Sequence, residues 1–588
     1  MRLVAITVVP LLILGGFELT LRIAGYGYDT DYFVESRVDG EDYLIPNHSF
    51  TYRFFPKELS RAPLATRVAA QKPAGTYRIF LFGESAAYGD PDPAYGVGRH
   101  LEVLLGERFP GTEFEVICTA MTAINSHAIL PIARECAKLD GDLWIIYMGN
   151  NEMVGAYGAG TVFSSRAPSL LVVRFLLALK ATRSGQLLTA MLDNTRKDAE
   201  PPENWEGINM FSKNLRHDDP GRLTAYDNFL GNLEDILKVA DSADVPVLLS
   251  TVASNIKDCA PFSSVRSESL TADQIGRWKE YFFKGLSHEA AGEYVEALDA
   301  YSEAATIDAG YAELSYRMGR CYWETRNFEE ARKAFRMARD HDGLAVRADT
   351  RINDIVRDLA RQLAAESGIL IDAEQLLSER SPNGISGREQ FFEHVHYTLA
   401  GNYQLARILL DGIVELLPEE VASEGSGQWL SEQMCRRKLA ATLWDQHRLW
   451  NNVLLRISVP PHTNQLNHQD NSRYCEERKK EVISRITRNT PREDRRLYET
   501  ALASQPDDNI MIERFAQYLE AMGSRKDAIQ QFEKLCRLLP DLEWPYYYLG
   551  ELWVREGNKQ KAAEAFQRAL DVRGDFIQAK AALDALGM

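Results

Sequence analysis

The chain has 588 residues, of which 45% are hydrophobic and 26% are charged, and its formal net charge is −17. At ~100–200 residues per domain this length predicts several domains, and the composition excludes a mostly disordered, collagenous or polytopic membrane protein. The acidic balance, with no long basic run, argues against a nucleic-acid partner. Seven scattered cysteines without a C-x-x-C pair suggest neither a zinc site nor a dense disulfide framework.

The N-terminal segment, residues 1–24, differs from this background. Residues 3–17 carry no charge, and the apolar run extends to Leu21 if Glu18 is included. Its length lies near the lower limit of the ~17–25 residues that span a bilayer, so an uncleaved membrane anchor, a cleaved secretory signal and a buried helix are all open. The first two interpretations predict an exported protein, with a periplasmic or extracytoplasmic body that is membrane-anchored, or secreted if the segment is cleaved.

Residues 25–74 are aromatic-rich without a clear period and are interpreted as a connector that packs on the next domain. From residue 77, short apolar runs bounded by Gly or Pro alternate with helical patterns, which is typical of an α/β parallel sheet covered by helices. The apolar stretch at 170–179 is too short to span a membrane and favours a buried or surface-docking helix. The predicted strands are 77–82, 113–118, 143–148, 245–251 and 368–371, with helices at 98–108 and 129–139.

An internal repeat of 34 residues interrupts this pattern. It resembles the tetratricopeptide repeat, in which small residues let two helices pack closely and an aromatic residue fills the gap. The α/β domain is therefore predicted as 75–277 and 346–417, with repeats inserted at 278–345, a helical linker at 418–490 and further repeats at 491–588. The pairs that are 34 residues apart include Gly285 with Gly319, Tyr301 with Phe335, Ala304 with Ala338, Ala516 with Gly550, Ala528 with Ala562 and Phe532 with Phe566.

Three clusters of polar residues follow predicted strands or precede the last helix of the α/β domain. Ser85 stands where the first strand gives way to a turn, which suits a nucleophile at the carboxyl edge of a parallel sheet but also suits a helix N-cap. Residues 149–152 (Gly-Asn-Asn-Glu) place amides at the same edge, as oxyanion donors or as an Asn-rich turn. Glu393 and His396 have the acid–histidine spacing of a catalytic triad, while His394 and His396 would suit a metal only with a third ligand.

The order and content of these clusters resemble the SGNH (GDSL-type) hydrolase family: Gly-x-Ser, then Gly-x-Asn, then an acid and a histidine before the last helix. The resemblance implies a flavodoxin-like, three-layer α/β domain in which Ser85 is the nucleophile and His396 the general base. It places Glu393 at the acidic position, although His396 can instead use a backbone carbonyl. The implied oxyanion donors are the Asn151 side chain and the backbone N–H groups of Ser85 and Ala123, with Ala120 the other option.

Weaker substrate-binding candidates lie at the same edge of the predicted sheet. They are Glu84, Asn150, His127 and Asn255, although for Asn255 a role in shaping a turn is the favoured interpretation. No metal or other cofactor is expected, because serine–histidine chemistry needs none and no Walker loop or G-x-G-x-x-G follows a strand.

Two functions remain open from the sequence. The first is an exported serine hydrolase or acyltransferase that acts on acyl esters of an envelope polysaccharide or lipid, with repeats that bind partner proteins. The second is a non-catalytic scaffold in which the repeats assemble an envelope complex. The expected partners are an ester substrate, other proteins through the repeats, and the membrane through the N-terminal segment.

Overall fold

The computed structural model describes residues 2–161, 167–194, 213–363, 367–426 and 428–587. Its centre is a five-stranded parallel sheet in the order β5-β4-β6-β7-β8. This is the 2-1-3-4-5 order of a flavodoxin-like sheet. The strands are β4 (Thr76–Gly83), β5 (Glu113–Cys118), β6 (Leu143–Tyr147), β7 (Val247–Ser250) and β8 (Gly368–Ile371), so the predicted strands are confirmed except that the third and fourth are shorter.

Helices cover both faces of this sheet and give it three layers. All of β4 and β6 is buried, which explains their continuous apolar sequences. On one face α3 (Val97–Arg108) packs on α14 (Leu399–Leu416), and on the other α7 (Pro220–Ser242) packs on α4 (Ser126–Cys136) and α12 (Thr350–Ala360). Shorter elements at the sheet are α2 (Ser85–Tyr88), η3 (Pro93–Tyr95), α13 (Ala373–Glu379) and η4 (Pro382–Gly384).

The segment interpreted as a connector contains a small antiparallel sheet of its own. Strands β1 (Phe33–Val38), β2 (Glu41–Pro46) and β3 (Val68–Ala69) pair in that order, and the short turns η1 (Phe50–Arg53) and η2 (Lys57–Leu59) lie between β2 and β3. Tyr32, Phe50 and Phe54 join the main hydrophobic core, so the segment packs on the α/β body as expected.

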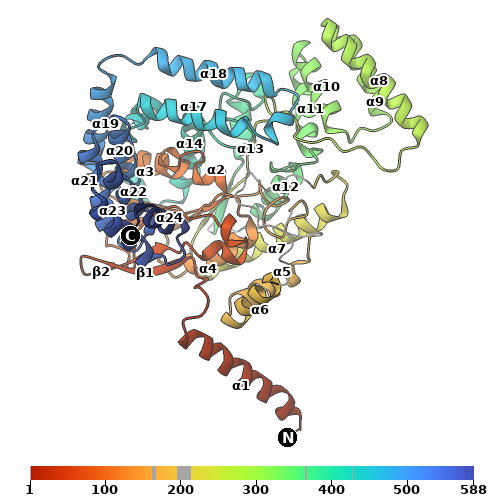
Figure 1. Cartoon of the computed structure of the whole chain (residues 1–588). Coiled ribbons are helices and arrows are strands. Elements are labelled where there is room, and N and C mark those ends of the chain that lie inside the picture. Colours follow the sequence, from red (N-terminus) through yellow and green to blue (C-terminus); the bar gives the residue numbers. More distant parts are fainter. Residues whose placement is uncertain (1, 162–166, 195–212, 364–366, 427, 588) are drawn as a thin grey trace.

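Helix α1 (Arg2–Ile23) leaves the body at one end of the molecule (Figure 1). Glu18 ties it to α6 (Arg183–Asn194) by accepting from the backbone N–H groups of Arg183 and Ser184, at 2.9 and 2.8 Å. Helix α5 (Leu170–Lys180) packs on α6. Among the described residues, no helix has both the length and the apolarity needed to cross a bilayer.

The inserted repeats form two helical hairpins that project from the body (Figure 1). A Cβ on Gly285 would lie 2.3 Å from the Tyr301 ring, and one on Gly319 would lie 2.7 Å from the Phe335 ring. The small residues therefore allow the close helix packing that the 34-residue spacing predicts. The four helices are α8 (Ala272–Ala291), α9 (Tyr294–Ala305), α10 (Ala312–Glu324) and α11 (Phe328–Asp340).

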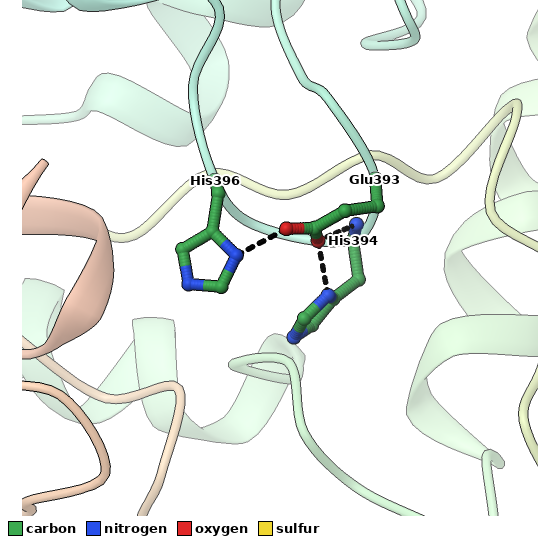
Figure 2. Close-up of side chains that lie close together, drawn as sticks. All are labelled: Glu393, His394 and His396. Atoms are coloured by element: carbon green, nitrogen blue, oxygen red, sulfur yellow. Dashed lines mark hydrogen bonds and ion pairs between the residues drawn. The ribbon is translucent and has the colours of Figure 1, made fainter. Parts of the chain in front are cut away.

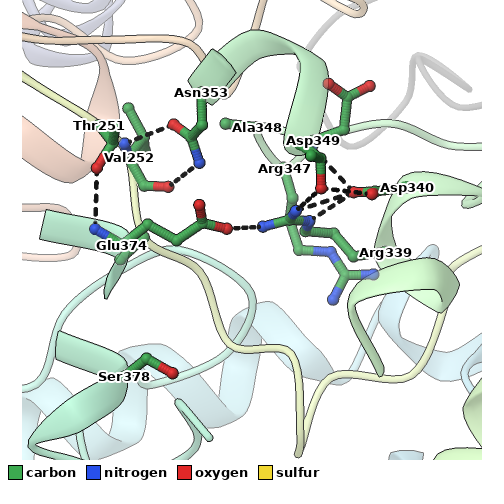
Figure 3. Close-up of polar contacts among 12 residues, drawn as sticks. Thr251, Val252, Arg339, Asp340, Arg347, Ala348, Asp349, Asn353, Glu374 and Ser378 are labelled. Carbon is green, nitrogen blue, oxygen red and sulfur yellow. Dashed lines mark hydrogen bonds and ion pairs between the residues drawn. The ribbon is translucent and has the colours of Figure 1, made fainter. Parts of the chain in front are cut away.

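Buried polar contacts join the last of these helices to the α/β body (Figure 3). Arg339 of α11 is 2% exposed and donates to Glu374 of α13 at 2.6 Å and to Thr350 of α12 at 2.9 Å. Burial alone would raise the pKa of Glu374, but the arginines hold it down at about 2. Asn353 of α12 bonds both the N–H and the C=O of Val252 after β7, at 2.8 and 3.0 Å. The C-terminal end of the inserted repeats is thus fixed to the edge of the sheet.

The C-terminal third is helical, and its first part belongs to the α/β body. Leu449, Val453 and Ile457 of α17 join the hydrophobic core that contains the sheet, so residues 418–490 are more than a linker. A further glycine–aromatic contact, between Gly550 and Phe566, marks the C-terminal repeats. The helices are α15 (Glu419–Ser423), α16 (Glu432–Lys438), α17 (Leu443–Ile457), η5 (His462–Asn464), α18 (His468–Ser484), α19 (Thr490–Ser504), α20 (Asn509–Ala521), α21 (Arg525–Leu538), α22 (Glu543–Arg555), α23 (Lys559–Val572) and α24 (Ile577–Leu586).

Candidate active site

Ser85 is the first residue of α2, and only Glu84 separates it from the end of β4. Gly83 allows this sharp turn, because a Cβ there would lie 2.4 Å from the Tyr147 carbonyl oxygen and 2.5 Å from Ala87 Cβ. A helix N-terminus leaves its first N–H groups without intrahelical acceptors. Ser85 therefore lies at a point of the chain where backbone N–H groups are available as donors.

The loop after η4 brings an imidazole to this serine. His396 Nε2 lies 2.8 Å from Ser85 Oγ, although the two residues are 311 positions apart. On the other side of the ring, His396 Nδ1 contacts Glu393 Oε1 (Figure 2). All three side chains are buried, at 8%, 6% and 6% exposed for Ser85, His396 and Glu393. The serine hydroxyl, the imidazole and the carboxylate therefore lie in a row, and their roles as nucleophile, base and acid stay a prediction.

Glu393 contacts two histidines and not one (Figure 2). Its second oxygen contacts His394 Nδ1 and also accepts from the His394 backbone N–H. Burial opposes ionisation of Glu393, but the two histidines and these hydrogen bonds hold its pKa well below its usual range. Burial lowers the pKa of His394. Glu393 is therefore an anion that can orient the His396 ring through Nδ1–H.

Asn255 supports this loop from the segment after β7. Its side-chain amide donates to the Glu393 carbonyl oxygen at 2.8 Å, and its backbone N–H donates to the His394 carbonyl oxygen at 2.9 Å. Arg347, which follows the inserted repeats, donates to the Asn255 carbonyl oxygen at 2.9 Å. Asn255 therefore helps to position the loop that carries Glu393 and His396. Its expected role in substrate binding stays a prediction.

The expected oxyanion donors lie in segments that follow three neighbouring parallel strands, β4, β5 and β6. Asn151 donates from Nδ2 to the Ile124 carbonyl oxygen at 3.0 Å, which uses one of its two amide hydrogens. Ala123, the residue before Ile124, has φ +65°, a left-handed conformation that favours glycine. Ala120, the other option, is fully buried. The role of the second Asn151 hydrogen and of the Ser85 and Ala123 N–H groups as oxyanion donors stays a prediction.

Glu84 and Asn150 hold the loops that carry these donors. The Glu84 carboxylate accepts from the backbone N–H of Asn150 at 2.7 Å and of Asn151 at 3.2 Å. Asn150 Oδ1 accepts from the Ala348 N–H at 3.0 Å. Both side chains are at most 2% exposed. Their carboxylate and amide groups are therefore engaged in joining strand ends, and contact with a substrate stays a prediction.

Glu152 and His127 belong to a second buried network, at the N-terminus of α4. Glu152 accepts from the backbone N–H and the hydroxyl of Ser126, both at 2.8 Å. Asn232 of α7 lies 2.9 Å from His127 Nδ1, and burial lowers the pKa of His127 to about 4. This network joins α4 to α7, and the expected role of His127 in substrate binding stays a prediction.

Glu152 makes folding stability depend on pH. Burial raises its pKa from the ordinary 4.5 to about 7. The folded protein therefore retains a proton that the unfolded chain has lost, so this contribution to stability is full below pH 4.5 and is lost as the pH rises to about 7. We expect Glu152→Gln to flatten the decline in urea midpoint across this window. Glu324→Gln, at an exposed site, is the control; an unchanged slope in Glu152→Gln would contradict the assignment.

Two further residues at the triad were missed by the sequence reasoning. Asp90 Oδ2 lies 3.8 Å from His396 Nε2, and Arg456 Nη1 lies 2.9 Å from His396 Nδ1 and 3.3 Å from Glu393 Oε1. Asp90 follows the expected Ser85 motif by five positions, but Arg456 lies in the segment interpreted as a linker. No motif or spacing connects Arg456 to the site.

Glu393, His394 and His396 are also close enough to share a metal ion, with one donor atom from each within 4.8 Å of the others. The Arg456 guanidinium lies 2.9 Å from His396 Nδ1, and its positive charge repels a metal ion at this position. The arrangement of these side chains therefore suits a carboxylate that orients a histidine better than it suits a metal site.

Comparison with known proteins concerns the repeats. Residues 289–348 match the tetratricopeptide repeat family model, so the chain contains this repeat. Comparison with curated proteins gave no match. Similar solved structures include YrrB, a TPR protein with an unusual peptide-binding site (13% identity, 52% of this chain and 90% of that one, TM-score 0.16). Others are MamA from Desulfovibrio magneticus RS-1 (13%, 51% and 97%, 0.15) and a thermophilic TPR protein from Thermus thermophilus (11%, 53% and 98%, 0.17).

Proposed function

We propose that the chain is a serine hydrolase or acyltransferase that acts on acyl esters, with an active site similar to that of SGNH (GDSL-type) hydrolases. The observation that carries the proposal is the 2.8 Å contact between Ser85 Oγ and His396 Nε2, with Glu393 on the opposite ring nitrogen. The matches to known proteins concern the repeats, so the catalytic proposal depends on this geometry and on the sequence motifs.

The chemistry follows from the placement of these groups. Ser85 Oγ attacks the ester carbonyl carbon while His396 Nε2 takes the hydroxyl proton, and Glu393 stabilises the imidazolium through Nδ1–H. The developing oxyanion accepts from Asn151 Nδ2 and from the N–H groups of Ser85 and Ala123. Collapse of this intermediate breaks the bond to the alcohol oxygen, which receives the proton from His396, and leaves an acyl-serine. Water or an acceptor hydroxyl then attacks the acyl-serine by the same route in reverse.

Covalent labelling tests this proposal directly. The full-length protein is treated with a fluorophosphonate probe, digested, and the adduct located by mass spectrometry. We expect one adduct, on Ser85 Oγ, which disappears when the protein is denatured before labelling. An adduct confined to other residues, or a folded protein that takes no label and hydrolyses no short acyl ester, would overturn the proposal.

A second function is proposed for the repeats, which are supported by the family match at 289–348. Repeats of this kind present extended surfaces to partner proteins, so the chain acts as a scaffold, with or without catalysis. Phe283 and Val295 of the inserted hairpins are 59% and 61% exposed. Partners captured by the full chain should be lost with Phe283→Asp or Val295→Asp and retained with Ser85→Ala. If all three variants retain the partners, the inserted repeats are not the surface that binds them.

We also propose that the body is exported and held at a membrane through the N-terminal segment. Exposed apolar side chains on α1 and α5 support this location: Leu12, Phe17 and Ile23 are 69%, 45% and 80% exposed, and Leu171 and Phe175 are 79% and 67% exposed. Flotation of the full chain with phospholipid vesicles tests the proposal. Phe175→Asp should weaken flotation, and a chain that stays with the soluble fraction would refute it.

A further inference from the structure

The Arg456 guanidinium lies between the catalytic acid and a second carboxylate. One nitrogen, Nη1, is 3.3 Å from Glu393 Oε1 and 2.9 Å from His396 Nδ1, and the other, Nη2, pairs with Asp90. The Arg456 side chain is 30% exposed and that of Asp90 is 16% exposed. Burial raises the pKa of Asp90, but Arg456 and His396 more than offset this and lower it. Asp90 is therefore an anion paired with the guanidinium.

Arg456 reaches the site from a part of the chain outside the expected hydrolase domain. It lies near the end of α17, which packs into the main core through Leu449 and Val453. The same helix carries Arg448, which pairs with Asp92 in the loop after α2. At its other end, Asp445 accepts from the Tyr498 hydroxyl of α19 at 2.6 Å. The loop that follows the nucleophile is thus held by α17, and α17 by the helices that lead into the C-terminal repeats.

The hydrogen bonds that Arg456 can make depend on the tautomer of His396. For His396 to take a proton from Ser85, Nε2 must carry the lone pair and Nδ1 the hydrogen, which it donates to Glu393. In this tautomer Nδ1 cannot accept from Arg456, so the guanidinium donates to Glu393 Oε1 and to Asp90 instead. Arg456 consequently fixes the Glu393 oxygen that orients the imidazole.

Charges face His396 from several elements. Glu393 lies at Nδ1 and Asp90 is 3.8 Å from Nε2, while the Arg456 cation lies 2.9 Å from Nδ1. The centre of the His394 ring is 5.2 Å from that of His396, and the His462 ring of η5 lies 5.7 Å from His394. Burial lowers the pKa of both neighbouring histidines, to about 3 for His462. Among the described residues, the charged groups with a contact to the imidazole within 4 Å are two carboxylates and one guanidinium, and the Arg61 cation interacts in turn with Asp90 and Arg456.

We infer that Arg456 is a positioning residue of the active site, supplied by the C-terminal helical region, which holds Glu393 against His396 and ties Asp90 beside Nε2. This inference rests on the proposed function for its kinetic consequence. Arg456 touches neither the nucleophile nor the bond that breaks, so it acts through Glu393 and Asp90. Activity consequently requires the C-terminal helices as well as the α/β domain.

The kinetic test uses three variants of the full chain. Arg456→Met should lower kcat/KM for a short acyl ester by up to about 10²-fold, because misplacement of a catalytic group costs this much. Because this variant removes a cation beside the imidazole, the acid limb of the pH–rate profile should move to higher pH. Asp90→Asn removes an anion and should move the same limb to lower pH. Arg456→Lys should keep the wild-type limb and recover part of the rate.

Arg361→Met is the matched control, since Arg361 is 71% exposed at the end of α12 and should leave rate and pH profile unchanged. A second readout needs no turnover. The rate of hydrogen–deuterium exchange at the His396 imidazole C2 position is measured by mass spectrometry as a function of pH. The pH midpoint of this rate should shift in opposite directions in Arg456→Met and Asp90→Asn. Shifts of the same sign, or none, would overturn the inference even if Ser85 is labelled. Opposite shifts in a protein that takes no label would refute the proposed function alone.

Discussion

Ser85→Ala is expected to lower kcat for a short acyl ester by about 10⁴- to 10⁶-fold, the range found when a serine nucleophile is removed. The physical reason is that no other described side chain bonds His396 Nε2 as Ser85 does at 2.8 Å, so without the hydroxyl no acyl intermediate forms. Since Ser85 lies at a helix start and loses only one oxygen, the melting temperature should change little. The rate is measured with purified full-length protein at saturating ester.

His396→Ala should cost a similar factor, and the double variant should be no worse than either single one, because the two residues act as a unit. Ser287→Ala is the matched control: its hydroxyl is exposed on α8 and donates to the Phe283 carbonyl oxygen. Multiplicative losses in the double variant, or turnover that survives Ser85→Ala, would show that the chemistry uses another nucleophile.

Asn151→Ala is expected to lower kcat by about 10²- to 10³-fold with little change in KM, because an oxyanion donor acts mainly in the transition state. Its main-chain N–H, which bonds Glu84 at 3.2 Å, is unaffected by the substitution. The substitution does remove the 3.0 Å bond from Asn151 Nδ2 to the Ile124 carbonyl oxygen, but Asn151 is only half-buried. The fold should therefore survive, and steady-state kinetics with a parallel thermal melt would separate the effect on rate from the effect on stability.

Asn150→Ala provides the contrast. Asn150 Oδ1 accepts from the Ala348 N–H at 3.0 Å in a buried position, so its loss leaves that donor unsatisfied and should lower the melting temperature. If Asn151→Ala destabilises the protein as much as Asn150→Ala, or raises KM without lowering kcat, Asn151 is not an oxyanion donor.

Local patterns in the sequence are sufficient to predict the parallel sheet and the repeats. Strands such as β4 are buried along their whole length and therefore have continuous apolar sequences. The repeats are visible in the sequence because a small residue must face an aromatic ring in each hairpin, as Gly285 faces Tyr301, and this requirement recurs every 34 residues. The short strands β1 and β2 were missed, since they are partly exposed and carry no clear alternation.

The candidate site was predicted only in part. Ser85, Asn151 and His396 follow strands or precede a helix in positions that a parallel sheet brings to one edge. The roles of Asn255 and Glu84 as supports of these loops depend on contacts across 138 and 66 positions, for which the sequence has no signal. The packing of residues 418–490 on the α/β body was not predicted for the same reason. The helical period of α17 does not indicate which surface of the body the helix covers.

The sequence by itself determined the residue types and their order: a serine after a strand, an acid and a histidine before a helix, and repeats with a fixed period. These signals are local, since they follow from backbone geometry and from contacts between near neighbours. The tertiary structure decided which distant groups meet. Only the folded chain brings Arg456 to Glu393 across 63 positions and to Asp90 across 366, because charge pairing at the site depends on packing and not on spacing along the chain.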